Sequence, residues 1–499
     1  MAEARRLLAG DRQQELDLGL VVPVAHAAVL GPAGQAGLFD MSGRKRGRPV
    51  PAAGVLKTCS RVLFDAIAGV YADLGFDALD DAVFRDLVIA RIVEPTSLLD
   101  VDRVLADLGR VSASLPTRKR TLKRCCDGRY RDRLAGLCFA HARAAGDLSL
   151  ILYDVTTLRT QAEKEDDLRK VGYSKDRSVD PQVMVGLLVD RQGFPLEVGC
   201  FKGNQAEKHT ILPIIEQFVA RHGLGRLVVV ADAGMLSAKN LAALDDAGHR
   251  FIVGSRMTKA PIDLASHFRW YGDAFADGQI IDTLTPKIGR NADNDPATRA
   301  EPVWDPGTHP GSWRAVWEYS RKRFAHDNRT LTAQENRAKD VVAGAKAPRK
   351  PRFVKATANG FSLDLAGIAR ARKLSGLKGY VTNIPADVMP AAEIIAHYHD
   401  LWHVEQSFRI SKNDLAAAPF FARRRDAIEA HLTIVFAALA ISRVIQNRTG
   451  LSIRRFLRTL RPLRHATIQA NGAIQTLPPV LSPDERAIID TLQTEPPRH

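Results

Sequence analysis

The first third of the chain carries apolar residues at the spacing of α-helices. They recur three or four positions apart across 62–74 and again across 84–92, so each set lies on one helical face. We therefore expect a helical region over 58–147. Residues 1–57 hold many Gly and Pro residues and no lasting apolar period, which favours a flexible, basic N-terminal segment.

The pattern changes to strands at residue 148. The run 148–153 is apolar and ends at Asp154, and the runs 182–189 and 194–201 flank a turn, which predicts a hairpin. Helix and strand then alternate: a helix from Ile211 to Gly223, a buried strand over 227–231 that ends at Asp232, a helix over 238–247 and a strand over 250–254. Residues 148–256 therefore predict a mixed α/β sheet flanked by helices, with antiparallel strands first and parallel strands afterwards.

Residues 257–388 interrupt this rhythm. The segment ends in a strand-like run over 379–383, so we expect an inserted domain that is β-rich at its ends. Four of the five tryptophans lie in it: Trp270, Trp304, Trp313 and Trp317.

Two long helices follow the insertion. The patterns predict one from about Ala391 to Asp414 and another from about Asp426 to Asn447. Together they make residues 389–447 the second part of the sheet domain. The tail, 448–499, is basic and then rich in proline, and we expect it to fray after Leu477.

Composition narrows the class of protein. The chain has 499 residues, 45% of them hydrophobic and 25% charged, as in ordinary globular proteins. Its five cysteines form no C-x-x-C pair, so neither a disulfide framework nor a cysteine zinc site is expected. The longest strongly apolar run, 432–441, is about half of the ~20 residues of a membrane span, and the N-terminus lacks the pattern of a signal peptide. We expect a cytoplasmic protein with no membrane segment.

The net charge of +15 makes a polyanion such as nucleic acid the leading class of partner. An RGRP tract in the N-terminal segment resembles an AT-hook, whose glycine lets the backbone enter a narrow minor groove beside its arginines. A second basic cluster lies in the helical region. Both clusters also have a simpler interpretation, as a solvated linker and a solvated helix face. The candidate DNA-binding residues in them are Arg46, Arg48, Arg118, Lys119 and Arg120.

Two carboxylates follow predicted strands of one sheet. Asp154 and Asp232 both stand at the carboxyl end of an apolar run, and such positions on neighbouring strands meet at one edge of the sheet. Two carboxylates there suit Mg²⁺, which takes few protein ligands and keeps positions for water and phosphate. A single aspartate after a strand more often caps a turn, and that alternative stays open for each.

The predicted helix after the insertion supplies a third carboxylate. Tyr398, Glu405 and Lys412 are spaced by seven residues, so they share one helical face with little angular drift. Arg409 lies on the same stripe. An aromatic, an acidic and a basic residue on one face are unusual for a buried stripe, although Glu405 and Arg409 could also form an ordinary surface ion pair.

These residues resemble the DDE transposases of bacterial insertion sequences, in the group with a Tyr-x2-Arg-x3-Glu-x6-Lys signature. The chain matches this signature at Tyr398, Glu405 and Lys412, and departs from it at Leu401, where the family has arginine. The segments YDVTTL, with Asp154, and VVVADAGMLSAKNLAAL, with Asp232, also resemble the family. The resemblance runs from about residue 84 to 447.

The resemblance implies an RNase H-like fold whose sheet is interrupted by a β-rich insertion. It implies that Asp154, Asp232 and Glu405 are catalytic and hold two Mg²⁺ ions, with Mn²⁺ as a substitute. Tyr398, Arg409 and Lys412 would contact DNA near the scissile end. The protein would cleave the ends of its element and join them to target DNA as a homodimer in the bacterial cytoplasm, at the nucleoid, and an insertion tryptophan could stack an extruded base.

Two other functions remain open at this point. The chain could be an inactivated, transposase-derived DNA-binding protein, or an RNase H-like nuclease that cuts without strand transfer. The assignment of the active site makes a geometric prediction: the carboxylates of Asp154, Asp232 and Glu405 should converge on one metal-sized space.

Overall fold

The computed structural model describes residues 54–493, except 147, 162–163, 173–179, 235–236, 290–296, 298–302, 348–350, 358–359, 421, 423 and 471–472. The predictions for Arg46 and Arg48 therefore lie outside the described residues. The last residues of the expected flexible segment belong instead to a strand, β1 (Gly54–Cys59), which pairs with a strand of the C-terminal region.

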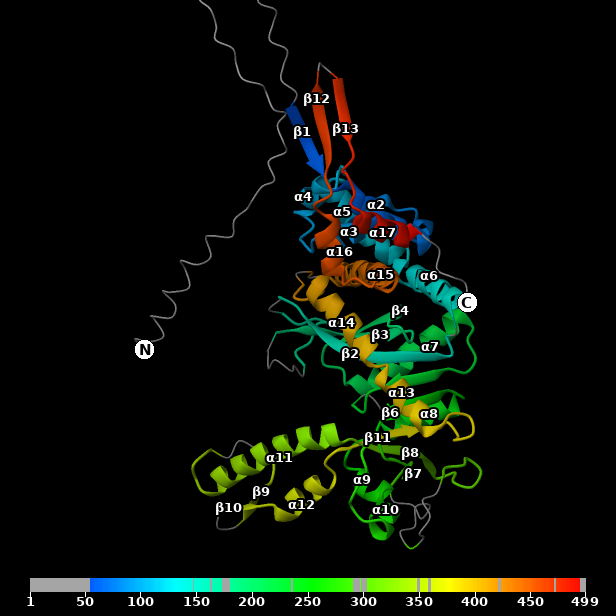
Figure 1. The fold of residues 1–499 in the computed structure, drawn as a ribbon, viewed down its shortest axis with the longest axis vertical. Helices are drawn as coiled ribbons and strands as arrows, with labels where there is room; N and C mark the ends of the chain where they lie inside the picture. The colour runs from blue at the N-terminus through cyan, green and yellow to red at the C-terminus, as the bar shows by residue number, and fades with distance from the viewer. Residues whose placement is uncertain are drawn as a thin grey trace, which may run out of the picture. The chain divides into compact units, whose positions relative to one another are not determined.

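An eight-stranded sheet forms the centre of the described chain, in the order β4-β3-β2-β5-β6-β11-β8-β7 (Figure 1). Its strands are β2 (Leu150–Arg159), β3 (Gln182–Val189), β4 (Pro195–Lys202), β5 (Val228–Ala231), β6 (Arg250–Gly254), β7 (Ile280–Pro286), β8 (Ser312–Tyr319) and β11 (Leu377–Thr382). β2, β3 and β4 pair antiparallel, whereas β5 and β6 run parallel to β2. The predicted fold class, a mixed α/β sheet flanked by helices, is confirmed.

One strand boundary was predicted wrongly. β2 does not end at Asp154 but continues to Arg159, because its second half pairs with β3 after its pairing with β5 has ended. The other elements of this part follow the sequence closely. β3 is buried along its whole length, as a continuous apolar run predicts for a central strand. α7 (Ile211–His222) and α8 (Ala238–Asp246) follow, and the hydroxyl of Ser237 caps α8 by accepting the Asn240 N–H.

Residues 257–388 extend the same sheet. β11 pairs antiparallel with β6, and β8 and β7 follow it to the sheet edge. The segment also holds α9 (Ala260–Asp263), α10 (Ala265–Trp270), α11 (Arg321–Val342), β9 (Val354–Thr357), β10 (Gly360–Leu363) and α12 (Leu365–Lys373). The 22-residue helix α11 was not predicted; it buries only Leu331, Ala338 and Val341, too few apolar positions for a visible period.

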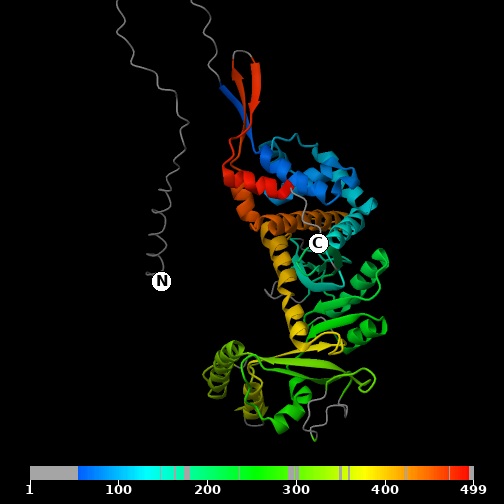
Figure 2. The ribbon, with the colours of Figure 1, turned by 45° about the vertical axis from the view of Figure 1, so that its right-hand side comes forward.

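The helical stretch after the insertion has three parts rather than one. α13 (Ala391–His399) and α14 (Trp402–Arg409) run along the sheet, in yellow and gold in Figure 2, and a π-helical turn, η3 (Ile410–Asp414), completes the stretch. α13 packs on β5, β6 and β11, and α14 packs on β2 and β3. The predicted continuous helix is therefore broken at Asp400 and Leu401, where the backbone bonds tighten to three-residue spacing.

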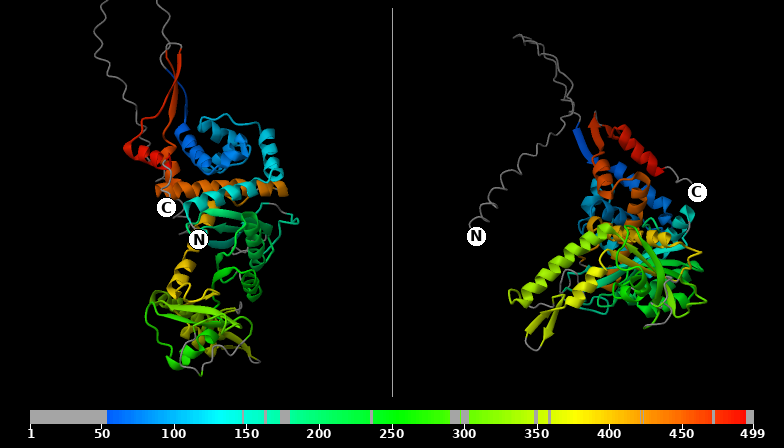
Figure 3. Two further views of the ribbon diagram at one scale, coloured as in Figure 1. Left: turned by 90° about the vertical axis from the view of Figure 1, so that its right-hand side faces the viewer. Right: turned by 60° about the horizontal axis from the view of Figure 1, so that its bottom comes forward.

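The predicted helical region consists of α2 (Arg61–Asp73), η1 (Phe76–Leu79), α3 (Ala82–Val93), α4 (Val101–Asp107), α5 (Leu115–Asp127) and α6 (Tyr130–Ala145). α15 (Arg425–Thr449) lies between these helices and the sheet, contacting α2, α3, α5, α6 and β4 (Figure 3, left). In the described chain α15 is the single helix whose length and hydropathy would also suit a membrane crossing, and 89% of its apolar window is buried inside the protein.

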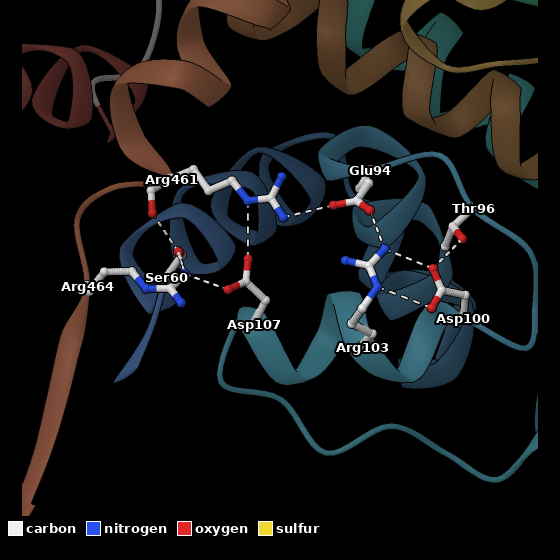
Figure 4. A network of polar contacts seen from close by, with 8 residues as sticks. All are labelled: Ser60, Glu94, Thr96, Asp100, Arg103, Asp107, Arg461 and Arg464. Carbon is white, nitrogen blue, oxygen red and sulfur yellow. Dashed lines mark hydrogen bonds and ion pairs between the residues drawn. The ribbon is translucent and has the colours of Figure 1, made fainter. Parts of the chain in front are cut away.

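The expectation that the tail frays after Leu477 was wrong, because residues 483–493 form a helix. α16 (Ile453–Leu460), β12 (His465–Ala470), β13 (Ala473–Leu477) and α17 (Pro483–Gln493) are all formed. The tail is anchored by its own basic residues, because Arg461 binds Asp107 and Glu94, and Arg464 binds Asp107 and Ser60 (Figure 4). These arginines therefore neutralise carboxylates of the N-terminal helices.

Candidate active site

Asp154 and Asp232 lie side by side on neighbouring parallel strands. The register of β2 and β5 pairs Tyr153 with Ala231; Asp154 is the next residue of β2, and Asp232 directly follows the end of β5. Neighbouring strands are about 4.8 Å apart, so both carboxylates stand at the same edge of the sheet. Asp154 is held there from its own backbone, because its Oδ1 accepts the Val155 N–H at 2.8 Å.

Tyr398 on α13 is bonded directly to this pair. Its hydroxyl donates to Asp232 Oδ1 at 2.6 Å. The close approach depends on Gly254 at the end of β6, because a Cβ there would lie 2.6 Å from the hydroxyl oxygen. Burial and the neighbouring Asp232 carboxylate raise the pKa of Tyr398, so the hydroxyl stays protonated and serves as a hydrogen-bond donor.

Glu405 faces the aspartates from α14. It is exposed and lies on the helix that packs against β2 and β3. Burial raises the pKa of Asp154 most, the Val155 N–H lowers it, and the charges of Glu405, Asp232 and Glu207 raise it by smaller amounts, to a total of about 7. Three carboxylates thus act on Asp154 at this edge of the sheet, which is an environment that favours a bound cation.

The three predicted ligands do not yet form a closed coordination group. Within the part of the chain that the structure describes, no three His, Cys, Asp or Glu side chains lie close enough to hold a metal ion. The expectation that the carboxylates already surround one metal-sized space is therefore wrong for this conformation. The physical reason is that Glu405 and Asp232 act on Asp154 as like charges, while Tyr398 and the Val155 N–H each hold one aspartate oxygen.

Two buried contacts fix α14 against the sheet. Ser407 on α14 donates its hydroxyl to the carbonyl of Gly193 in the β3–β4 turn at 2.7 Å. Arg443 on α15 is 3% exposed and donates both to the Gln192 carbonyl of that turn and to Gln406 Oε1 on α14. The turn needs glycine at 193, where φ is 81° and a Cβ would meet the Arg443 guanidinium. These contacts set the position from which Glu405 projects.

The basic cluster on α5 divides into two kinds of residue. Lys119 and Arg120 are exposed, as DNA contacts would need to be. Arg118 is 2% exposed and donates to Asp102 at 3.0 Å. Its predicted role in DNA binding was therefore wrong, because its guanidinium is enclosed in the helical region.

The remaining residues of the signature differ in exposure. Arg409 is exposed one turn beyond Glu405 on α14. Lys412 is half-buried in η3, and it lines an apolar cavity together with Leu158 and Phe408. Leu401, at the family's arginine position, is 8% exposed and packs in the main hydrophobic core, so this position supplies packing rather than charge.

Sequence reasoning missed two charged neighbours of the site. Glu207 follows β4 in the GNQAEKHT segment and acts on Asp154. Lys378 on β11 lies 3.5 Å from the Tyr398 hydroxyl. For Glu207 the sequence carries a usable signal, because it follows a predicted strand in a polar segment, whereas a lone lysine in a strand gives none. Of the insertion tryptophans, Trp304, Trp313 and Trp317 are buried and Trp270 is 41% exposed.

Comparison with known proteins identifies the family. A family model described as "Transposase DDE domain" matches residues 145–441, well over half of the chain, including Asp154, Asp232 and Glu405. No curated protein matches the chain. Among solved structures, the chain is similar to a cryo-EM structure of a piggyBac transposase synaptic complex with hairpin DNA, at 9% identity over 81% of this chain and 79% of that chain, with a TM-score of 0.39, which is too low to support further conclusions. From the family match, the chain belongs to the family of transposases with a DDE domain.

Proposed function

We propose that this transposase binds the terminal inverted repeats of its element, cleaves the element's ends in a metal-dependent reaction and joins them to target DNA. The observation that carries the proposal is the placement of Asp154 and Asp232 on adjacent strands, with Glu405 acting on Asp154 from α14. The arrangement supplies oxygen ligands alone, the type that Mg²⁺ and Mn²⁺ prefer.

Asp154, Asp232 and Glu405 would hold the ions. Divalent ions, when bound, activate the attacking oxygen and stabilise the leaving oxygen at phosphorus. Oδ1 of each aspartate already accepts a hydrogen bond, so Oδ2 of each would be available to a cation. Binding also requires a side-chain movement, and both Asp232 and Glu405 are exposed, whereas Asp154 is half-buried.

The reaction needs no covalent enzyme intermediate. Water cleaves a phosphodiester bond at the element's end and leaves a 3′-hydroxyl. That hydroxyl then attacks a phosphodiester bond of the target and displaces a 3′-oxygen there. Tyr398 is not the nucleophile, because its hydroxyl is protonated and donates to Asp232; its role is to orient that carboxylate.

Double-stranded DNA is the proposed partner. Arg409 stands exposed beside Glu405, and Lys119 and Arg120 present a second basic surface on α5. Such residues bind phosphates, so DNA affinity should fall steeply with salt. Because two ends must be held together for joining, we include a homodimer in the proposal, acting at the nucleoid in the bacterial cytoplasm.

A joining reaction tests this function. The substrate is a plasmid that carries the gene with its flanking DNA, incubated with the full chain, a target plasmid and Mg²⁺ or Mn²⁺. We expect joined products from the wild type and none from Asp232→Asn, with Asp246→Asn on the exposed side of α8 as the matched control. Nicking without joining would indicate a nuclease instead, and binding without metal-dependent nicking would indicate a non-catalytic DNA-binding protein.

A further inference from the structure

Lys378 stands at the catalytic edge of the sheet. β6 ends at Gly254, which pairs with Tyr380 on the antiparallel strand β11. Lys378, two residues before Tyr380, therefore lies just beyond the carboxyl end of β6. That is the edge at which β2 and β5 present Asp154 and Asp232. Residues two apart share a face of a strand, so Lys378 and Tyr380 point to the same side.

Tyr398 holds the Lys378 side chain in place. The Lys378 Nζ lies 4.9 Å from the centroid of the Tyr398 ring and 3.5 Å from its hydroxyl. An ammonium over an aromatic face is attracted by the ring. Because the same hydroxyl donates to Asp232 at 2.6 Å, the ammonium is within two hydrogen-bond lengths of a catalytic carboxylate. Tyr380 packs edge-on against Tyr398 at 4.9 Å and completes the support.

This ammonium has no counter-ion in direct contact. Among the residues that the structure describes, no carboxylate oxygen comes within ion-pair distance of Lys378 Nζ, and its cross-strand neighbour Glu318 acts on Tyr380. Arg323, exposed at the start of α11, adds a second positive charge on that side. The Asp232 charge acts on Lys378 only from beyond the Tyr398 hydroxyl. A half-buried ammonium with no carboxylate in direct contact has only part of its charge compensated, so its position suits a further anion.

We propose that Lys378 binds a phosphate oxygen of the DNA strand that is cleaved at Asp154, Asp232 and Glu405. The proposal rests on the proposed function and adds a substrate contact to it. A fixed ammonium beside reacting phosphates stabilises their negative charge as a point charge. Lys378 lies on a strand inside the sheet, and its ammonium packs over the Tyr398 ring. The side chain is therefore ordered before DNA binds, which reduces the conformational entropy lost on binding.

A charge-deletion experiment distinguishes this contact from a purely structural role. The substrates are duplexes of the terminal repeat taken from the DNA that flanks the gene, each with one phosphate near the cleavage site replaced by a neutral methylphosphonate. Cleavage rates are measured for the wild type, Lys378→Gln and Lys378→Arg. The matched control is Lys373→Gln, because Lys373 also lies over an aromatic ring, that of Phe268, at 4.2 Å. Thermal unfolding of every variant confirms that it is folded.

We expect Lys378→Gln to cleave the unmodified duplex about 100-fold more slowly, Lys378→Arg to recover part of that loss, and Lys373→Gln to behave as the wild type. At one phosphate, the methylphosphonate should slow the wild type strongly and Lys378→Gln little further, because both changes remove the same contact. The proposal is wrong if, at every phosphate, the methylphosphonate slows Lys378→Gln by the same factor as the wild type. It is also wrong if a folded Lys378→Gln cleaves at the rate of the wild type. If the wild type cleaves no duplex, the proposed function fails instead.

Discussion

Replacing Asp154 by asparagine should stabilise the metal-free protein at alkaline pH and abolish its activity. The side chain is half-buried just beyond the pairing of β2 with β5, and burial together with the charges of Glu405 and Asp232 raises its pKa to about 7. Asparagine has nearly the same shape and keeps an Oδ1 that can accept the Val155 N–H. The substitution therefore removes the charge and leaves the local backbone contact.

The size and sign of the effect follow from the two pKa values. An aspartate of the unfolded chain has a pKa of about 3.9, so between about pH 4 and pH 7 the folded protein holds a proton that the unfolded chain has lost. The free energy of unfolding of the wild type should therefore fall as pH rises through this window and stay low above it. Full ionisation of Asp154 at pH 8 lowers the free energy of unfolding of the wild type by up to about 4 kcal/mol. Asp154→Asn has no charge at this position and does not suffer this loss.

Urea unfolding in EDTA at pH 4.5 and pH 8, about the two ends of this window, measures the effect. We expect the wild type and Asp154→Asn to have similar free energies of unfolding at pH 4.5, and Asp154→Asn to be the more stable of the two at pH 8. Asp246→Asn, on the exposed side of α8, should match the wild type at both. Mg²⁺ should stabilise the wild type but not Asp154→Asn. A variant that is no more stable than the wild type at pH 8 would refute the reasoning.

Three further substitutions test the supports of the site. Tyr398→Phe removes the hydroxyl bonded to Asp232 and should slow end cleavage about 10- to 100-fold without unfolding the protein. Arg443→Met should lower the cleavage rate at saturating DNA, because it releases α14 from the β3–β4 turn, while DNA affinity in a filter-binding assay stays unchanged. Arg314, fully buried, binds Asp282 and two backbone carbonyls ahead of α13; Arg314→Met should destabilise the fold by about 3–5 kcal/mol in urea.

Exposed residues of the same types serve as controls. Tyr271→Phe, at a tyrosine that is 54% exposed, should leave cleavage unchanged. Arg329→Met on the exposed side of α11 should leave both stability and cleavage unchanged. Normal cleavage by Tyr398→Phe or Arg443→Met would show that these contacts do not position the carboxylates, and a stable Arg314→Met would show that its ion pair is dispensable.

The position of the first two carboxylates could be predicted because local patterns encode it. An apolar run that ends in aspartate marks both strands, and parallel pairing then brings Asp154 and Asp232 together. The seven-residue spacing of Tyr398 and Glu405 likewise placed both on the side of the carboxylates, although the helix between them is interrupted at Leu401. Short-range periodicity survives such a break because the chain stays helical on both sides of it.

What could not be predicted depends on long-range pairing. The pairing of β11 with β6, which brings Lys378 to the site, joins residues more than a hundred positions apart. A run of basic residues likewise does not reveal which side chain is buried in the fold, as that of Arg118 is where it binds Asp102. The sequence also could not show how close the three carboxylates lie, because two aspartates at one edge of a sheet do not by themselves bring Glu405 into a group with them.

The central claim is that Asp154, Asp232 and Glu405 together bind divalent ions when DNA is present. Iron-directed cleavage of the protein measures this directly: Fe²⁺ replaces Mg²⁺ in the complex with terminal-repeat DNA, ascorbate and peroxide generate radicals at the ion, and mass spectrometry maps the cuts in the chain. The account predicts cuts beside all three residues in the wild type and their loss in Asp232→Asn. Cuts confined to other segments, or cuts at the two aspartates with none beside Glu405, would contradict it.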